Sequence, residues 1–306
     1  MTRLNELRLI ARVAQMYHVE HQRQSTIASH LRISQATISR MLKRAQEEEI
    51  VRTTVVSPSG IYSDLEEGLR LKYDIKEAIV VECSEDRDGA IMSRIGEAAA
   101  HFLEATLQPD EIIGVSSWSE TVLKMVENIH PLKLGRAKYV VQTLGGMGDP
   151  TVQMHANHLT TRLAKLTGAE PRMLSAPGVA QSREAKLVLL GDSYLRATMD
   201  LFSKITLAIV GVGTVAPSDM LARSGNVFTS HELSAVQEAG GTGDISLRFF
   251  DTHGNPIKSA LDDRVIGMTL EELAKVDRVI AVAGGHSKTP AIHGALKSKV
   301  IDLLIT

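Results

Sequence analysis

Residues 24–52, QSTIASHLRISQATISRMLKRAQEEEIVR, contain two short helical segments separated by only a few residues. A helix is predicted from about Ser25 to His30, followed by a tight turn at residues 31–33. Ser34 can begin a second helix, because its hydroxyl can accept a hydrogen bond from a free backbone N–H group. Within that helix an inward apolar stripe recurs at three- and four-residue spacing, at Ile38, Met41, Leu42 and Ala45. This pattern predicts a helix-turn-helix.

The outward face of the second helix is polar and basic. Amide and hydroxyl groups at its start suit the edges of DNA bases, and the cations further along suit phosphates. A basic face that is merely solvated is the alternative interpretation. The residues predicted to bind DNA are Ser34, Gln35, Thr37, Ser39, Arg40, Lys43 and Arg44.

Two neighbouring features favour the DNA-binding interpretation. An upstream amphipathic segment, Leu4 to Val19, supplies the third helix that so small a fold needs for a core. Charge is also divided unevenly, because residues 1–60 hold nine Lys and Arg against five Asp and Glu, whereas the remainder holds 25 against 31. A basic head on an acidic body is what attraction to phosphates at one end requires.

The length of 306 residues predicts two unequal domains, at 1–56 and 57–306. Residues 50–56 have the pattern of a short β-tail, and residues 57–60 (SPSG) are the best candidate for a linker. The one cysteine, Cys83, excludes an internal disulfide and a cysteine-based zinc site. The N-terminal residues lack a secretory apolar core, and no apolar run reaches the length of a membrane span, so a soluble, cytoplasmic protein without a membrane partner is expected.

Beyond a connecting helix at Ser63–Tyr73, short β-rich runs alternate with helices. Nearly continuous apolar strands separated by helices predict an α/β domain with a parallel sheet covered on both faces. The expected strands are 78–82, 112–115, 139–142, 207–211, 246–250, 279–282 and 300–304, and the expected helices are 91–107, 119–129, 153–167, 193–202, 270–276 and 290–297.

Four strand-to-helix junctions are rich in small and hydrogen-bonding residues: 114–121, 144–148, 210–214 and 283–290. In a parallel sheet, ligands bind beyond the carboxyl ends of the strands, where helix N-termini attract anions. Lys288 adds a cation at the start of the last helix. Each loop alone could be only a sharp turn, but four at one sheet edge predict an anion-binding site. None has the spacing of a P-loop or of a dinucleotide site.

Three further residues or pairs have two interpretations each. Asp244 can accept hydrogen bonds from ligand hydroxyls or simply stabilise a turn. Trp118 can pack in the core or face a ligand. His155 and His158 lie three apart on a helix, but without a carboxylate partner a metal site is not expected, and no cofactor is expected either.

These stretches resemble a known family, the SorC-type bacterial sugar-responsive transcriptional regulators. The resemblance covers essentially the whole chain and rests on residues 24–51, IGVSSWSETV, LGGMGD, GVGT, GTGDISLRFFDTHG and, most specifically, AVAGGHSKTPAIHGALKSKVIDLLIT. It implies a helix-turn-helix domain followed by a Rossmann-like effector domain similar to sugar-phosphate isomerases and deaminases. It also implies a small phosphorylated sugar or polyol as effector, and a homotetramer.

Carried over by position, the resemblance implies phosphate contacts at Ser117, Ser119, Thr121, Gly211, Gly213, Thr214, Gly285 and Lys288, and hydroxyl recognition at Asn157 and Asp244. Trp118, Gly145 and Gly146 complete the expected effector site. The chain departs from the family pattern twice. Ser119 stands where the family often has Gly, and Glu49 replaces the glycine that usually provides a left-handed helix stop.

The sequence therefore predicts a regulator that binds double-stranded operator DNA and senses a small sugar phosphate or polyol. An enzyme of the isomerase or deaminase class is the alternative, with Asp244 and His286 as candidate acid and base. A structural DNA-binding protein without an effector would leave the four ligand-ready loops unexplained.

Overall fold

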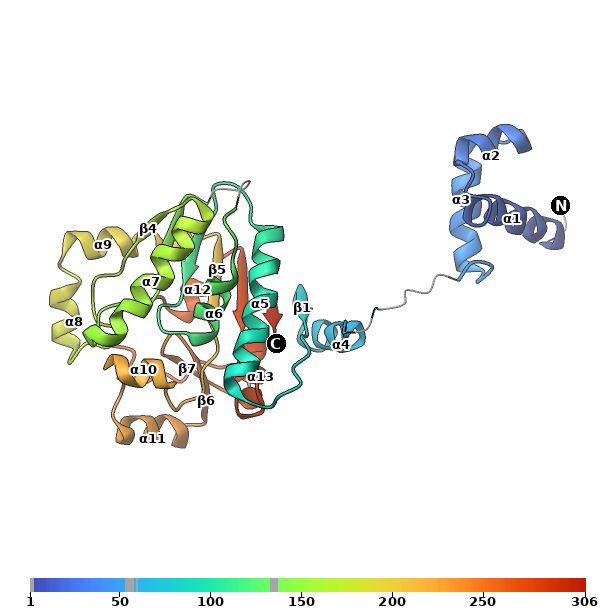
Figure 1. Ribbon diagram of the computed structural model, residues 1–306. Helices are drawn as coiled ribbons and strands as arrows, with labels where there is room; N and C mark the ends of the chain where they lie inside the picture. The colour runs from blue at the N-terminus through green and yellow to red at the C-terminus, as the bar shows by residue number, and fades with distance from the viewer. Residues whose placement is uncertain (1–2, 53–57, 59, 133–136) are drawn as a thin grey trace. The chain divides into compact units, whose positions relative to one another are not determined.

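The computed structural model describes residues 3–52, 58, 60–132 and 137–306. The chain divides into two compact units, Met1–Pro58 and Ser59–Thr306 (Figure 1). The expected β-tail is not present in its described part, because residues 50–52 form no strand, and residues 53–56 lie outside the described residues. Two of the four expected linker residues, 57 and 59, also lie outside them.

The first unit consists of α1 (Arg3–His18), α2 (Gln24–Leu31) and α3 (Gln35–Glu47). α2 ends at Arg32, whose backbone is left-handed with φ of 54°, and the chain then turns directly into α3. The Ser34 hydroxyl accepts a hydrogen bond of 3.1 Å from the Thr37 N–H group, which confirms the expected cap. The inward stripe is confirmed too, since Ile38 and Leu42 pack on Val13 of α1 and Ile27 of α2.

The second unit is built on a seven-stranded parallel sheet, which confirms the α/β fold class. The strand order is β1-β9-β8-β5-β2-β3-β4. The strands are β1 (Glu77–Ile79), β2 (Ile112–Val115), β3 (Tyr139–Gln142), β4 (Glu170–Arg172), β5 (Leu207–Gly211), β8 (Arg278–Val282) and β9 (Leu303–Ile305).

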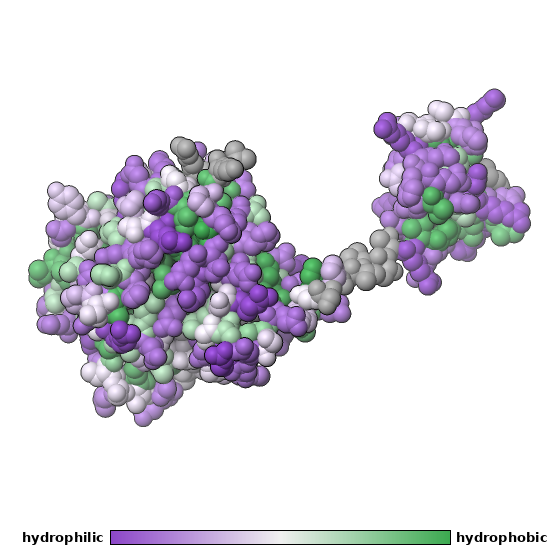
Figure 2. Space-filling view, viewed as in Figure 1, coloured by the Kyte–Doolittle hydropathy of each residue, from purple (hydrophilic) through white to green (hydrophobic). Residues whose placement is uncertain are grey.

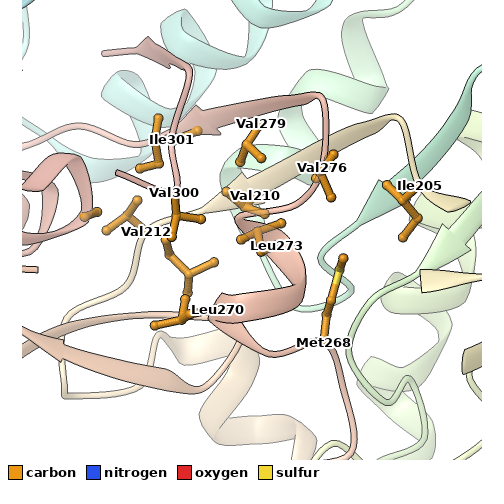
Figure 3. Close-up of a cluster of buried hydrophobic side chains, with 14 of the residues drawn as sticks. Ile205, Val210, Val212, Met268, Leu270, Leu273, Val276, Val279, Val300 and Ile301 are labelled. Atoms are coloured by element: carbon orange, nitrogen blue, oxygen red, sulfur yellow. The ribbon is translucent and has the colours of Figure 1, made fainter. Parts of the chain in front are cut away.

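Helices cover both faces of this sheet. On one face α5 (Asp88–Thr106), α6 (Glu120–Asn128) and α7 (Pro150–Thr167) pack on side chains such as Ile113 and Ile209. On the other, α9 (Ser193–Met199), the 3-10 turn η1 (Phe202–Lys204), α12 (Leu270–Leu273) and α13 (Thr289–Lys297) contribute to a second core. Figure 3 shows part of that core, with Val210 near Leu273 and Val279. β5 thus sends alternate residues to the two faces, as a central strand must.

An antiparallel ribbon was not foreseen. The expected strand 246–250 is replaced by β7 (Arg248–Asp251), which pairs with β6 (Gly241–Ile245) outside the main sheet. Two residues, Ser246 and Leu247, join them, and both have positive φ, 54° and 64°. This is the backbone that a tight hairpin requires, but it occurs here without the usual Asn-Gly pair that would reveal it in a sequence.

Four helices and a further short turn complete the unit. α4 (Ser63–Tyr73) was expected. Three others were not: α8 (Arg183–Leu189), α10 (Asp219–Ser224) and α11 (Ser230–Glu238). α8 has no fully buried residue, so it lacks a readable apolar stripe. The turn η2 (His286–Lys288) leads into α13.

Among the residues coloured in Figure 2, hydrophilic side chains cover most of the face shown. In the described part of the chain, no helix combines the length and the apolar character needed to cross a bilayer.

Candidate functional site

A cavity lies where the order of the sheet reverses. From β2 the chain proceeds to β3 and β4 on one side, whereas β5, on the other side of β2, is followed by β8 and β9. The connections after β2 and β5 therefore diverge there and leave a crevice, the position at which open α/β sheets bind ligands. The cavity has a volume of about 440 Å³, within the range of small-molecule sites.

Eight of the thirteen expected effector residues line this cavity. They are Trp118, Ser119, Thr121, Gly211, Gly213, Thr214, Asp244 and Lys288. They come from three strand-to-helix loops and the β6–β7 ribbon, so the fold brings together residues that are up to 170 positions apart in the chain.

The loop after β2 is held in place by hydrogen bonds to the loop after β3. The Trp118 indole Nε1 donates to the Gly145 carbonyl at 2.8 Å, and the Ser117 hydroxyl donates to the Leu144 carbonyl at 2.9 Å. The Ser119 hydroxyl caps α6 by accepting a hydrogen bond of 3.3 Å from the Val122 N–H group. These bonds fix the loop before any ligand binds.

The loop after β5 positions Asp244. Gly213 and Asp244 exchange two backbone hydrogen bonds of 3.0 Å, which dock the β6–β7 ribbon against the sheet edge. A methyl group on Gly213 would collide with the Asp244 carboxylate, so glycine is required for this approach. The absence of a side chain at Gly213 therefore leaves room for the Asp244 carboxylate.

Asp244 is buried with 8% of its surface exposed. Its Oδ2 atom accepts a hydrogen bond of 2.8 Å from the Leu247 N–H group, whereas Oδ1 accepts none from the described residues. Burial raises the pKa of Asp244 to about 6, although the Leu247 N–H group and the Lys288 ammonium oppose that shift. The open oxygen is suited to a ligand hydroxyl, which it can meet as acceptor when ionised and as donor when protonated.

The loop after β8 supplies the cation. Gly285 has φ of 103°, a backbone that only glycine adopts easily, and it turns the chain toward η2. Lys288 lies on the cavity wall directly before α13. Within the described part of the chain its ammonium group forms no ion pair within 4 Å, so it is available to an anion.

Five expected effector residues do not line the cavity: Ser117, Gly145, Gly146, Asn157 and Gly285. Ser117 is fully buried, because its hydroxyl holds the loop together. A methyl group on Gly145 would lie 2.4 Å from the Pro177 carbonyl oxygen, so this glycine allows close packing of two backbone segments. Asn157 lies on α7, away from the cavity wall, and its carbonyl accepts the Thr161 hydroxyl.

The structure adds lining residues that were not among the thirteen expected effector residues. Among them are Asp88, Met92, Ser116, Glu120, Pro217, Asp219, Ser246 and Leu247. Glu120 Oε1 accepts a hydrogen bond of 3.1 Å from the Met220 N–H group, which ties the start of α6 to α10. An expected enzymatic partner, His286, is exposed and does not line the cavity.

The outward face of α3 in the first unit is open to solvent. Gln35, Ser39, Arg40 and Lys43 are exposed, as is the cap residue Ser34. The Thr37 hydroxyl shares a 2.8 Å hydrogen bond with that of Ser34, so it helps to cap the helix. The face combines polar side chains at the helix start with cations one and two turns later.

Arg44 is less available than its neighbours on α3. Its guanidinium pairs with Glu6 of α1 and lies 3.7 Å from Glu48. The carboxylates at and after the end of α3 are also paired, Glu47 with Lys43 at 3.8 Å and Glu49 with Arg52 at 2.9 Å. The three consecutive carboxylates are therefore largely neutralised within the unit.

The left-handed helix stop survives without glycine. Glu49 has φ of 55°, so it adopts the backbone that a glycine in this position would favour. Its N–H group donates to the Gln46 carbonyl at 3.1 Å.

The described residues contain no group of three metal-ligating side chains, and His155 and His158 belong to no such cluster.

Comparison with known proteins places the chain in a family. Residues 58–306 match the model of the "Putative sugar-binding domain" family. The deoxyribonucleoside regulator of Bacillus subtilis (strain 168) is 32% identical over 292 residues, covering 95% of this chain and 92% of the relative. The erythritol catabolism regulatory protein of Brucella abortus (strain 2308) is 28% identical, over 97% of this chain and 93% of its own.

A solved structure extends the match over both units. The crystal structure of the full-length sorbitol operon regulator SorC from Klebsiella pneumoniae has a TM-score of 0.72 and 28% identity, covering 98% of this chain and 96% of that one. These relatives are regulators of transcription, not enzymes. The chain belongs to the SorC-type family of sugar-responsive bacterial transcriptional regulators.

Proposed function

We propose that this regulator binds double-stranded operator DNA through α3 and senses a small phosphorylated sugar or polyol in the cavity at the β2–β5 crevice. One observation carries the effector assignment: Lys288 and Asp244, an available cation and an open carboxylate oxygen, face the same cavity. We assign the DNA function to residues 1–56 and the effector function to residues 57–306.

The proposed DNA contact divides into reading and anchoring residues. Gln35 and Ser39 lie on the exposed side of α3 near its start, where a recognition helix presents side chains to base edges. Arg40 can reach either a guanine edge or a phosphate, and Lys43 a phosphate. Arg44 contributes to a lesser extent, because its charge is already shared with Glu6 and Glu48.

The proposed effector contact has a charged end and a hydroxyl end. Lys288, on the cavity wall directly before α13, attracts an anion. Asp244 and the hydroxyls of Ser119 and Thr214 can bind ligand hydroxyl groups. The names of three relatives refer to a deoxyribonucleoside, erythritol and sorbitol, all polyhydroxylated molecules of this size class.

Coupling between the two units is thermodynamic. An effector changes operator affinity only if it binds the DNA-competent and DNA-incompetent assemblies with different affinities. We propose a cytoplasmic homotetramer, in which the subunit interface sets the spacing of the recognition helices, because paired readers need half-sites about one helical turn or a multiple apart.

The test combines ligand screening with operator binding. A panel of sugar phosphates and free polyols is screened by thermal shift, since a ligand of the native state raises the melting temperature. Lys288→Ala should abolish the effector's influence on operator retardation without changing operator binding in its absence. Lys297→Ala is the matched control, because this exposed lysine ends the same helix and does not line the cavity. Equal effector sensitivity in both variants would contradict the proposal.

A further inference from the structure

Four helices begin at the cavity wall. α5, α6 and α10 each carry a carboxylate in the first turn, Asp88, Glu120 and Asp219 respectively, and all three line the cavity. α13 has no acidic residue in its first turn, and Lys288 precedes it. The starts of the four helices are therefore electrostatically unequal.

This difference determines where an anion can bind. A helix N-terminus attracts negative charge, but a carboxylate in its own first turn already occupies that favourable position and repels a second anion. Glu120 is held at the wall by the hydrogen bond from the Met220 N–H group, so it does not swing away freely. Among the described helices that begin at the wall, α13 alone has no carboxylate in its first turn and a cation, Lys288, directly before it.

The remaining charged group of the wall is Asp244. It is more than nine-tenths buried, and its Oδ1 atom has no hydrogen-bond donor among the described residues. The described lining thus contains four carboxylates, Asp88, Glu120, Asp219 and Asp244, and one cation, Lys288. A ligand that satisfies this wall needs hydroxyl groups along most of its length.

We propose that the cavity selects ligands with a single anionic group, held at Lys288, and excludes ligands with a second one. The accepted class is the monophosphate of a sugar or polyol. The excluded class comprises sugar bisphosphates and phosphorylated sugar acids, whose second anion would face Asp88, Glu120 or Asp219. This inference rests on the proposed effector function and makes those three carboxylates specificity determinants.

Isothermal titration of the full-length chain with matched pairs tests the inference. The pairs are ribose 5-phosphate against ribose 1,5-bisphosphate, fructose 6-phosphate against fructose 1,6-bisphosphate, and glucose 6-phosphate against 6-phosphogluconate. In whichever pair binds, the ligand with one anionic group should bind more tightly by about tenfold or more, because juxtaposed like charges oppose binding strongly. Equal or tighter binding of the second member would overturn the inference.

A rim variant connects the selectivity to its residues. The double variant Asp88→Asn with Asp219→Asn should reduce the difference in affinity between the two ligands of a pair. Both residues are exposed, so the substitutions should not impair folding. Glu238→Gln, at the exposed end of α11 outside the cavity lining, should leave the gap unchanged. An unchanged gap in the double variant would overturn the role of the rim.

Two other results separate this inference from the proposed function. Binding of free sorbitol or erythritol, with no binding of any phosphate, would overturn the single-anion rule while leaving effector sensing by the cavity intact. No binding by any of these compounds, together with unchanged operator retardation, would overturn both.

Discussion

The two candidate surfaces are assembled in opposite ways. The proposed DNA-binding side of α3 comes from one continuous stretch, residues 34–44, whose side chains are mostly exposed. The cavity takes its wall from segments between Asp88 and Lys288, joined by the crossovers of the sheet and by the β6–β7 ribbon. The first surface depends on local helix geometry, and the second depends on tertiary structure.

This difference indicates which substitutions should leave the rest of the fold unchanged. An exposed cation on α3 has little influence on its own fold, because water solvates its charge in the folded and the unfolded state. Asp244 is buried beside Gly213 and Leu247 and is influenced by the charge of Lys288, so its own charge affects stability as well as the proposed ligand binding. Substitutions on α3 should therefore change function without changing stability, whereas substitution of Asp244 should change the two in opposite directions.

The largest expected effect comes from Asp244→Asn. Burial raises the pKa of this carboxyl from 3.8 to about 6, so ionised Asp244 destabilises the native state. The native state binds more protons than the unfolded state between those pH values, and wild-type stability falls as pH rises through them. At pH 7.5 the variant should gain up to about 3 kcal/mol in free energy of unfolding by urea, and lose effector affinity. The gain should vanish near pH 3.8.

Asp251→Asn, in the same ribbon, is the matched control of opposite sign. Burial raises the pKa of Asp251, but hydrogen bonds from Asn255 and His253 outweigh it and hold the pKa below its usual value. Removing this carboxylate should destabilise the fold at pH 7.5 and leave effector affinity unchanged. If Asp244→Asn instead destabilises the chain at that pH, the Leu247 N–H group and Lys288 stabilise the buried carboxylate by more than its burial costs.

The same contrast explains what the sequence could predict. The bounds of β2, β3 and β5 were predicted correctly, and α2 and α3 lie where the sequence placed two helices, because each element is specified by a local apolar pattern. β4 was missed, since its residues are Glu170, Pro171 and Arg172, and an edge strand tolerates such a sequence.

The cavity wall was predicted only in part. Glycine-rich junctions after strands indicated Gly211, Gly213 and Lys288, but nothing local indicates that Asp88 and Asp219 meet there. The Ser246-Leu247 turn was missed for a related reason. Its positive φ values are imposed by the ribbon and by the Leu247 bond to Asp244, not by residues that favour such a backbone.

Arg40→Ala is the next largest effect and tests whether α3 acts locally. If the guanidinium contacts a base edge, operator binding should weaken by about 1–3 kcal/mol, with little change in the unfolding of the first unit. Fluorescence anisotropy with operator and with a scrambled duplex measures the loss, which should be confined to the operator. An equal loss on both duplexes would reassign Arg40 to a phosphate.

Lys43→Ala should have a smaller effect that does not depend on sequence. If its ammonium binds one phosphate, the logarithmic salt slope of operator binding should decrease by about one. Titrations at several salt concentrations measure the slope for wild type, Lys43→Ala and Arg44→Ala. Since Arg44 already pairs with Glu6, its removal should change the slope less. A larger change for Arg44 would show that DNA breaks that pair.

Glu49→Gly should have the smallest effect, and it increases stability. Glu49 holds a left-handed backbone with φ of 55°, which is unfavourable for a residue with a Cβ atom, while glycine adopts it readily. After the entropic penalty of glycine is subtracted, we expect the free energy of unfolding of the first unit to rise by about 0.5–1 kcal/mol. Hydrogen exchange of the α1–α3 amides in the full-length chain measures the gain. Glu49→Ala removes the same ion pair with Arg52 but keeps the Cβ atom, so equal protection in both variants would assign the effect to the carboxylate instead of the backbone.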